Sequence, residues 1–544
     1  MALPEHGPQT ELAEKREEFC WVIPWGTTLL KSLEADGVQL THAHPTAKDH
    51  IWLLRLRLPS EIQDAFGTAP EVLLLVVRGA VQARDLERAR AELYRAEYRL
   101  DLDLLVVSDD QPQLADRLHR MPGRWGQWVP WPGSREAMMS LPDMFREHLP
   151  TFDIFEEKNP VRGRGVIGRE EEIADLTSRI ENAESIGVFG LRKVGKTSVV
   201  RAVTDALDPV SASMSMRAQT AEGQSQQAAV RVLACWLDVQ RAYDRSARRL
   251  YSTLAAEIEK RLSAHGMTIP SPPTDDLQRI DDLIRLTMEK TALPLCIVLD
   301  EYDFLFEGSQ GQPPIANIAA FLRLLRGWAQ QTQRLCVVVI GRDPTPFQSP
   351  EVDGFPNPML GWFVTRWLGP LAPQRANELL SRLGKRVGLD IGSVTLELAL
   401  SLTGGHPLLH RQFGSSLLEH TNDRPLNSSH LNTDVLCKAA ALDFHERGAV
   451  REICHEILHL LRTRFQASYD SLVHAARTSP IEALHHASWS SPAVVQLRNF
   501  GLFLGSAAKS ASIPLVLTVY VRTFERRPSR SSRHRNSNRR GWHR

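Results

Sequence analysis

A glycine-rich segment in the first half of the chain limits the fold more than any other feature. Residues 186–200 read IGVFGLRKVGKTSVV and contain the spacing G-x-x-x-x-G-K-[ST]. Four apolar residues predict a short strand over 186–189, and a helix is expected to begin at Lys196. A strand that passes through a tight glycine loop into a helix is typical of α/β proteins, so this segment predicts a parallel sheet.

The same loop predicts a phosphate-binding site. Its glycines allow backbone N–H groups to surround phosphate oxygens, and the start of the helix adds unpaired donors and partial positive charge. Lys196 is expected to reach the β- and γ-phosphates of a nucleotide, and the Thr197 hydroxyl is expected to ligate Mg²⁺. The candidate contacts run through the whole loop: Gly190, Leu191, Arg192, Lys193, Val194, Gly195, Lys196, Thr197 and Ser198.

A second decisive segment begins at Leu293 and reads LPLCIVLDEYD. Its continuous apolar run predicts a strand covered on both faces, and Asp300 and Glu301 follow at the carboxyl edge of the sheet, where ligands bind. Asp300 is expected to hold the Mg²⁺ shell, and Glu301 is expected to orient or deprotonate an attacking water. These two roles predict hydrolysis of the bound nucleotide.

A further apolar strand is predicted over residues 335–340, and it leads into Gly341-Arg342-Asp343. A cation at this strand end can contact a γ-phosphate and sense its hydrolysis, so Arg342 is a candidate catalytic residue. A surface arginine without such a role is the alternative interpretation. The chain contains no Asn-Lys-x-Asp guanine selector and no Ser-Gly-Gly-Gln of the ABC type, which favours adenine as the bound base.

These motifs together resemble those of the AAA+-related STAND and archaeal-type ATPases. Gly168-Arg169 before the phosphate loop and LTGGHP at residues 402–407 complete the set, and the resemblance covers about residues 160–525. It implies a parallel sheet with the phosphate-loop and acidic strands adjacent, followed by a helical lid and a winged helix. It also implies that Gly168 and Arg169 lie near the adenine and that Pro407 of the lid lies over the base.

The predicted fold class is α/β, with a P-loop NTPase parallel sheet at its centre. A polar insertion at residues 211–227 has no assigned role, and no arginine finger is evident, so assembly and turnover rate stay open. The expected boundaries are 1–155 for a smaller α/β N-terminal domain of unknown role, 160–370 for the ATPase core, 371–428 for the lid, 429–525 for the winged-helix-like domain and 526–544 for a basic disordered tail.

Strand and helix signals alternate in the N-terminal domain, but its chemistry cannot be assigned. A nuclease would need an Asp followed by Glu-x-Lys at a strand end, which is not found, so the acidic residues after position 100 are interpreted as a solvated strand end. The expected strands are 21–24, 50–58, 71–78 and 101–107, and the expected helix is 85–97.

The last part of the chain predicts a winged helix. Helices are expected over 434–445, 450–464, 469–476 and 493–499, followed by a hairpin whose second strand is 513–521. Only Arg498 supplies a cation on the expected recognition helix, so a protein–protein hinge is the alternative to DNA binding. The tail from Arg522 holds nine arginines and one acid, Glu525, and either contacts nucleic acid or only aids solubility.

Residues 455–459 read HEILH and match the zinc-protease pattern H-E-x-x-H. His455 and His459 both fall on the polar face of the expected helix, which fits a metal and equally fits solvent. Because no third ligand is evident, a metalloprotease is the weakest functional alternative.

Composition narrows the surroundings of the protein. The 544 residues carry a formal net charge of +1, and the six cysteines are scattered, which predicts reduced thiols in a cytoplasmic protein. No apolar leader and no apolar run of about 18 residues is present, so no membrane contact is expected.

The sequence therefore predicts an ATP-binding and ATP-hydrolysing switch that uses ATP and Mg²⁺ in signalling or defence, with a homo-oligomer or another protein as its partner. The main alternative is a DNA-associated ATPase that resembles origin-binding or transposition helpers and uses the winged helix and the basic tail.

Overall fold

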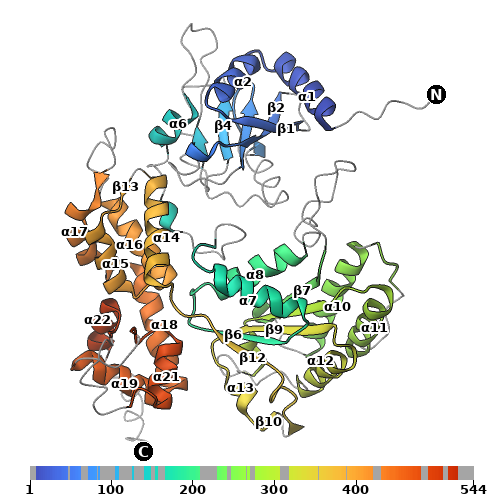
Figure 1. The fold of residues 1–544 in the computed structure, drawn as a ribbon, viewed down its shortest axis with the longest axis vertical. Helices are drawn as coiled ribbons and strands as arrows, with labels where there is room; N and C mark the ends of the chain where they lie inside the picture. Colours follow the sequence, from blue (N-terminus) through green and yellow to red (C-terminus); the bar gives the residue numbers. More distant parts are fainter. Residues whose placement is uncertain are drawn as a thin grey trace, which may run out of the picture.

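The computed structural model shows an N-terminal α/β unit, a central sheet flanked by helices, and a helical unit that follows the central sheet along the chain (Figure 1). The structure describes residues 8–46, 50–62, 71–82, 84–85, 104–108, 125–127, 140–148, 153–156, 166–208, 230–241, 247–264, 266–269, 276–306, 318–352, 355–387, 389–420, 431–478, 488–505 and 512–524. The expected helix 85–97, the insertion 211–227 and the tail 526–544 therefore lie wholly or almost wholly outside the described residues.

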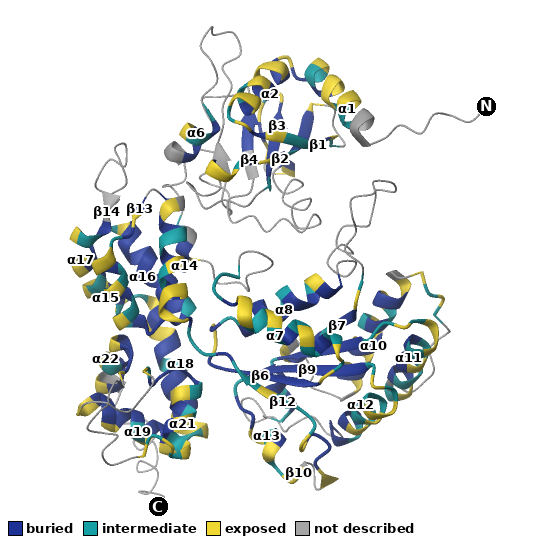
Figure 2. Cartoon of the chain, viewed as in Figure 1, coloured by how far each residue is buried: buried dark blue, intermediate teal, exposed yellow. Residues whose placement is uncertain are grey.

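The central sheet has five parallel strands in the order β12-β6-β9-β8-β7. Every residue of β6, β8 and β9 is buried, as expected for strands covered on both faces (Figure 2). The predicted P-loop-type parallel sheet is confirmed. The strand bounds are β6 Ile186–Phe189, β7 Leu233–Asp238, β8 Leu295–Asp300, β9 Leu335–Gly341 and β12 Val364–Trp367.

The strand order corrects one expectation. The phosphate-loop strand β6 does not neighbour the acidic strand β8, because β9 pairs with both of them and lies between. Length and apolar content define each strand, but neither property says where a later strand enters the sheet. The consequence is functional, since Arg342 after β9 is placed between the phosphate loop and the acidic pair.

Helices cover both faces of this sheet. One face packs against α7 and α8 through an apolar cluster, and the other packs against α10, α11 and α12 through a second cluster. The bounds are α7 Glu170–Glu181, α8 Lys196–Leu207, α10 Ala247–Ala264, α11 Asp276–Lys290 and α12 Ile318–Thr332. Between β9 and β12 the chain forms α13 Thr345–Gln348 and a short hairpin of β10 Glu351–Val352 and β11 Phe355–Pro356.

A group of helices follows β12, with α16 at its centre, and it extends past the predicted lid bounds 371–428 to residue 444; the name lid is used below for this group. All residues from Leu408 to Leu418 of α16 are buried. A two-residue parallel ladder, β13 Leu389–Asp390 with β14 Leu431–Asn432, closes this group. The helices are α14 Pro373–Arg386, α15 Ser393–Thr403, α16 Pro407–Glu419 and α17 Cys437–Phe444.

The C-terminal helices differ from the predicted winged helix at one element. The apolar segment 513–521, expected as a strand, lies mostly in helix α22 Leu515–Phe524, and the described residues nearby hold a single antiparallel bridge between Leu504 and Ser512. Burial on α22 follows a helical period, because Val516, Leu517, Tyr520 and Val521 are buried. The preceding helices are α18 Gly448–Arg464, α19 Gln466–Arg477 and α21 Pro492–Asn499.

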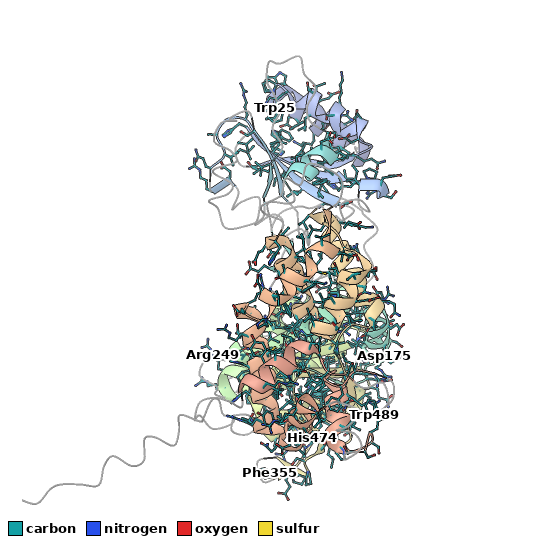
Figure 3. The ribbon with its side chains drawn as sticks, turned by 90° about the vertical axis from the view of Figure 1, so that its left-hand side faces the viewer. Trp25, Asp175, Arg249, Phe355, His474 and Trp489 are labelled. Carbon is teal, nitrogen blue, oxygen red and sulfur yellow. The ribbon has the colours of Figure 1, made fainter. Side chains whose placement is uncertain are left out.

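The N-terminal unit is a mixed sheet in the order β1-β2-β3-β4-β5. The expected strand at residues 21–24 is wrong: α1 continues to Val22, with Phe19 and Ile23 one turn apart in the core and Trp21 86% exposed. Figure 3 labels Trp25 in this unit, far from Trp489 and His474 of the C-terminal helices. The bounds are α1 Pro8–Val22, α2 Gly26–Ala35, β1 Gln39–Pro45, β2 Ile51–Arg57, β3 Glu71–Val77, β4 Leu104–Ser108, β5 Trp125–Gln127 and α6 Leu141–His148.

Among the described residues, no helix has both the length and the apolar character needed to cross a bilayer.

Candidate nucleotide site

The phosphate loop connects β6 to α8 and needs glycine at two positions. A Cβ on Gly190 would lie 2.3 Å from the carbonyl oxygen of Leu368, so the strand end leaves no room for a side chain. Gly195 caps α8 with φ 103°, and Lys193 also has a left-handed backbone at φ 62°. Leu191 and Val194 turn into the apolar cores, while Arg192 and Lys193 stay exposed.

Lys196 lies inside this loop. Its Nζ donates to the carbonyl oxygens of Gly190 at 3.0 Å and Leu191 at 2.9 Å, and the residue is 9% exposed. Burial lowers the pKa of Lys196, and the nearby Glu301 carboxylate opposes that shift. The ammonium group is thus held at the mouth of the loop by weak acceptors that a phosphate can replace.

Thr197 and Asp300 come together from distant parts of the chain. The Thr197 hydroxyl donates to Oδ1 of Asp300 at 3.2 Å, and Asp300 is 9% exposed. Burial first, and then the adjacent charge of Glu301, raise the pKa of Asp300 to about 6. A buried carboxylate beside a hydroxyl is a fitting oxygen pair for Mg²⁺, because a divalent cation would offset the repulsion that raises this pKa.

Glu301 has a left-handed backbone, with φ 54° and ψ 42°, directly after β8. A residue with a side chain rarely adopts this conformation, and such strain is concentrated at functional sites. The backbone N–H of Glu301 donates to Oδ1 of Asp300 at 3.1 Å, which fixes the turn. Oδ1 of Asp300 thus accepts from both the Thr197 hydroxyl and the Glu301 backbone.

Arg342 follows β9 and is held by Asp303, a residue for which the sequence predicted no role. Asp303, 2% exposed, accepts the backbone N–H of Arg342 at 2.9 Å and that of Asp343 at 3.1 Å, and it lies 3.7 Å from Nε of Arg342. Tyr302 adds a hydrogen bond from its hydroxyl to the carbonyl oxygen of Asp343. Asp303 and Tyr302 thereby join the turn after β8 to the turn after β9. The spacing Asp-Glu-x-Asp, which begins at Asp300, is the sequence signal that could have indicated the role of Asp303.

Gly168 and Arg169 lie behind the phosphate loop. Arg169, 4% exposed, donates to the carbonyl oxygens of Val194 at 3.3 Å and Gly369 at 2.5 Å. Gly168 has φ 76°, and a Cβ there would lie 2.6 Å from Cβ of Arg375 in the lid. The two residues therefore link the loop, the end of β12 and the lid, and their position relative to an adenine stays a prediction.

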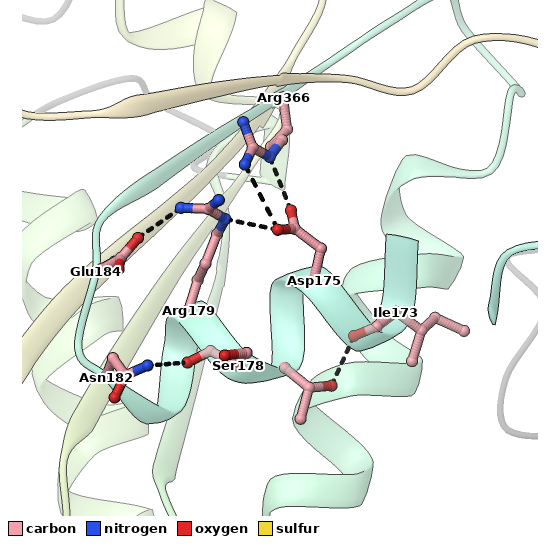
Figure 4. A network of polar contacts seen from close by, with 8 residues as sticks. Ile173, Asp175, Ser178, Arg179, Asn182, Glu184 and Arg366 are labelled. Carbon is pink, nitrogen blue, oxygen red and sulfur yellow. Dashed lines mark hydrogen bonds and ion pairs between the residues drawn. The ribbon is translucent and has the colours of Figure 1, made fainter. Parts of the chain in front are cut away.

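The helix that follows Gly168 and Arg169, α7, is tied to the edge strand β12. Asp175 of α7 accepts hydrogen bonds from Arg366 of β12 at 2.7 Å and from Arg179 at 2.9 Å, and Arg179 also bonds to Glu184 (Figure 4). The hydrogen bond from Arg366 lowers the pKa of Asp175. This network orients α7, and with it the segment at Gly168.

The lid reaches the phosphate loop through His406, one residue before Pro407. His406 caps α16, and its Nε2 lies 3.1 Å from the carbonyl oxygen of Arg192. Burial lowers the pKa of His406 to about 4, so the ring is neutral and donates from Nε2 to that oxygen. The lid thus touches the same loop that holds Lys196.

Helix α18, the first of the helices after the lid, also contacts the phosphate loop. Glu456, the glutamate of the HEILH motif, forms an ion pair with Arg192. A cavity of about 360 Å³ separates the loop from the helix, and it is lined by Leu191, Arg192, Arg342, Ile453, Glu456, Ile457, His459, Leu460, Thr463 and Arg464.

The HEILH side chains diverge instead of meeting at a metal. The ring of His455 packs edge-on against Tyr520, His459 is exposed beside the cavity, and Glu456 is engaged with Arg192. In the parts of the chain that the structure describes, no group of three or more His, Cys, Asp or Glu side chains is placed to hold a metal ion. The metalloprotease alternative therefore has no support from these residues.

Comparison with known proteins agrees with this site. Residues 179–345 match the family model described as an AAA domain, and no curated protein matches the chain. Solved structures include the Walker-type ATPase of Pyrococcus abyssi, with TM-score 0.44 and 17% identity over 68% of this chain and 99% of that one. The ORC2 protein of Aeropyrum pernix matches with TM-score 0.40 and 13% identity over 69% of this chain and 98% of that one. Cdc6p of Pyrobaculum aerophilum matches with TM-score 0.34 and 12% identity over 68% of this chain and 97% of that one.

The sheet order, the loop geometry and the family match all point to the same part of the chain. Strand order, phosphate loop and acidic pair all fall within or beside the matched residues. Residues 179–345 are thus similar to an AAA domain, and they carry the phosphate loop and most strands of a P-loop-type parallel sheet.

Proposed function

We propose that this protein is an ATP-dependent switch that binds Mg²⁺ and ATP in the central domain, hydrolyses the nucleotide and acts in signalling or defence. The observation that carries the proposal is the meeting of Thr197 and Asp300, 3.2 Å apart, beside Lys196 and Glu301. These residues come from two segments of the chain and converge at one edge of a buried sheet, where P-loop enzymes place their nucleotide.

Each residue has a distinct task in this proposal. Lys196 leaves the carbonyl oxygens of Gly190 and Leu191 and binds the terminal phosphates, and the loop N–H groups bind the remaining oxygens. Thr197 and Asp300 would hold Mg²⁺, which would supply positive charge against the phosphates. Glu301 accepts a proton from the attacking water.

The switch depends on contacts between the loop and the other units. His406 of the lid binds the carbonyl oxygen of Arg192, and Glu456 of α18 pairs with the Arg192 side chain. A triphosphate attracts the Arg192 guanidinium and competes with Glu456 for it. Nucleotide binding therefore changes the contact that holds α18 against the loop. The surface exposed by this change is expected to bind a second copy of the chain or another protein.

Three variants test the enzymatic part of the proposal. Lys196→Ala is expected to abolish ATP binding, and Glu301→Gln is expected to retain ATP while slowing its cleavage by at least about 100-fold. Lys260→Ala is the matched control, since this lysine is exposed on α10 away from the site. Equal turnover in all four proteins, wild type included, would remove the assigned roles.

Molecular mass with and without nucleotide tests the switch itself. Light scattering on the Glu301→Gln protein is expected to give a change of mass or of partner binding when Mg²⁺ and ATP are added. A mass and a partner affinity that ignore nucleotide in this variant contradict the switch, even where ATP binds.

A DNA-associated role has one supporting feature, the nine arginines from Arg522 onward. The helix expected to read DNA offers little, because Arg498 stacks on the ring of Trp489 at 4.4 Å and the second strand of the expected wing is a helix. Deleting residues 525–544 is expected to remove salt-dependent binding to duplex DNA if this role exists. Binding that survives the deletion would place the contact elsewhere.

A further inference from the structure

The segment between the N-terminal unit and the central domain is anchored on the lid. Residues Ile154–Glu156 form a single turn that packs on α16, and Phe155 in this turn is fully buried. The Asp153 side chain accepts the backbone N–H of Phe155 at 2.9 Å and holds the turn in shape. The described part of the connection therefore packs on the lid, although the chain enters the central domain next.

The surface of α16 is shaped to receive this turn. A Cβ on Gly414 would lie 2.3 Å from the Phe155 ring, so a glycine is needed where the ring crosses the helix. Arg411, one turn earlier and 8% exposed, donates from Nε to the carbonyl oxygen of Phe155 at 3.1 Å. Gly414 and Arg411 together form a specific socket for Phe155. Without Phe155, the space above Gly414 would be empty and the buried Arg411 guanidinium would lose an acceptor, and both losses would cost stability.

The same helix contacts the phosphate loop at its other end. His406 at the start of α16 binds the carbonyl oxygen of Arg192, and Gly414 follows eight residues later, a rise of about 12 Å along the helix. The residues from Leu408 to Phe413 between the two contacts are all buried, and close packing of this kind transmits displacement along the helix. A shift of the helix start must move the socket.

We propose that α16 is a relay that couples the nucleotide state of the phosphate loop to the position of the N-terminal unit, through the socket that Arg411 and Gly414 form for Phe155. This inference rests on the proposed ATP switch. It adds that the N-terminal unit moves together with the lid, and not with the central sheet, when the nucleotide state changes. The N-terminal unit is then the output or sensory arm of the switch.

The anchor is tested first, without nucleotide. Spin labels on cysteines introduced at Lys31 of α2 and Lys385 of α14, both exposed, report the distance between the N-terminal unit and the lid after Cys20→Ser. A narrow distance distribution is expected in the parent protein and a broad one in Phe155→Ala. Phe355→Ala, at an exposed ring on β11, is the matched control and is expected to leave the distribution narrow. A broad parent distribution, or a narrow one in Phe155→Ala, overturns the anchor.

The relay is tested second, with labels at Lys31 and at Lys290 on α11 of the central domain. Adding Mg²⁺ and a non-hydrolysable ATP analogue is expected to shift this distance in the parent and to leave no defined shift in Phe155→Ala. A lid-to-core pair at Lys385 and Lys290 is expected to shift in both proteins. A lid-to-core shift with no N-terminal shift in the parent overturns the relay alone, whereas no shift of either pair overturns the proposed switch and the relay with it.

Gly414→Val supplies an independent variant, because its side chain fills the notch and leaves Phe155 itself intact. Its effect on both distances is expected to match that of Phe155→Ala. If Gly414→Val disrupts the lid, the Phe155→Ala result stands without it, since removal of this ring leaves α16 unchanged in sequence.

Discussion

Replacing Asp300 by asparagine should stabilise the nucleotide-free protein while removing its metal-dependent nucleotide binding. Asp300 is buried, its charge is repelled by Glu301, and these two effects raise its pKa from 3.8 to about 6. A carboxyl group whose pKa is raised in the folded protein favours unfolding at pH values above its unfolded pKa, because the unfolded chain holds the charge at lower cost. Asparagine removes the charge and keeps a similar shape and an acceptor for the Thr197 hydroxyl.

The magnitude follows from the pKa. A difference of about two pKa units corresponds to about 3 kcal/mol at pH 7.5, as an upper bound. The hydrogen bond from Thr197 is weaker to a neutral amide than to a carboxylate by about 1 kcal/mol, which reduces the gain. We therefore expect Asp300→Asn to raise the opening free energy of β8 by about 1–2 kcal/mol at pH 7.5.

The sign of the pH dependence provides the check. The destabilisation caused by Asp300 is absent below about pH 3.8, grows between pH 3.8 and pH 6 and is constant above pH 6. The gain in stability from Asp300→Asn should therefore be small at pH 4 and full at pH 7.5. Hydrogen exchange of the β8 and β9 amides, followed by mass spectrometry at both pH values, measures it. A loss of stability at pH 7.5, or a gain that is the same at pH 4, refutes the reasoning.

Three further predictions concern the loop and its contacts. Gly190→Ala places a Cβ 2.3 Å from a backbone oxygen and should cost about 1–3 kcal/mol in the unfolding of the core, whereas Gly327→Ala, in open space on α12, should gain about 0.5–1 kcal/mol; denaturant titration compares them. Glu456→Gln should tighten ATP binding by up to about 5-fold, because a half-exposed ion pair with Arg192 contributes at most about 1 kcal/mol, and calorimetry should find no such gain when Arg192→Ala is already present. Burial lowers the pKa of His406 to about 4, so lowering the pH from 7 to 5 should weaken the docking of α16 by up to about 2 kcal/mol through this group, measured by exchange of the α16 amides; His406→Gln should reduce the dependence but not abolish it, because burial also lowers the pKa of His410 in α16 to about 4.

Several elements of the site could be predicted from the sequence because local patterns determine them. The strand Ile186–Phe189 and the helix start at Lys196 lie where the glycine spacing put them, and β8 ends at Asp300 as its apolar run indicated. The roles predicted for these residues stay predictions.

Long-range features could not be predicted, because no local pattern encodes them. Arg192 and Glu456 are far apart in sequence and meet only after α18 packs beside the phosphate loop. The segment 513–521 was assigned to a strand because it is rich in β-branched and apolar residues, although the burial of Val516, Leu517 and Tyr520 follows a helical period. Packing against neighbouring helices overrode the local preference at this segment.

The most direct test of the account is a crystal structure of the Glu301→Gln protein grown with Mg²⁺ and ATP. The account predicts a triphosphate in the loop from Gly190 to Thr197, with Nζ of Lys196 on its terminal oxygens and one metal shared by the Thr197 hydroxyl and the Asp300 carboxylate. Nucleotide bound elsewhere, or a loop still closed on Lys196 with Asp300 facing no metal, would contradict the claim that these residues form one site.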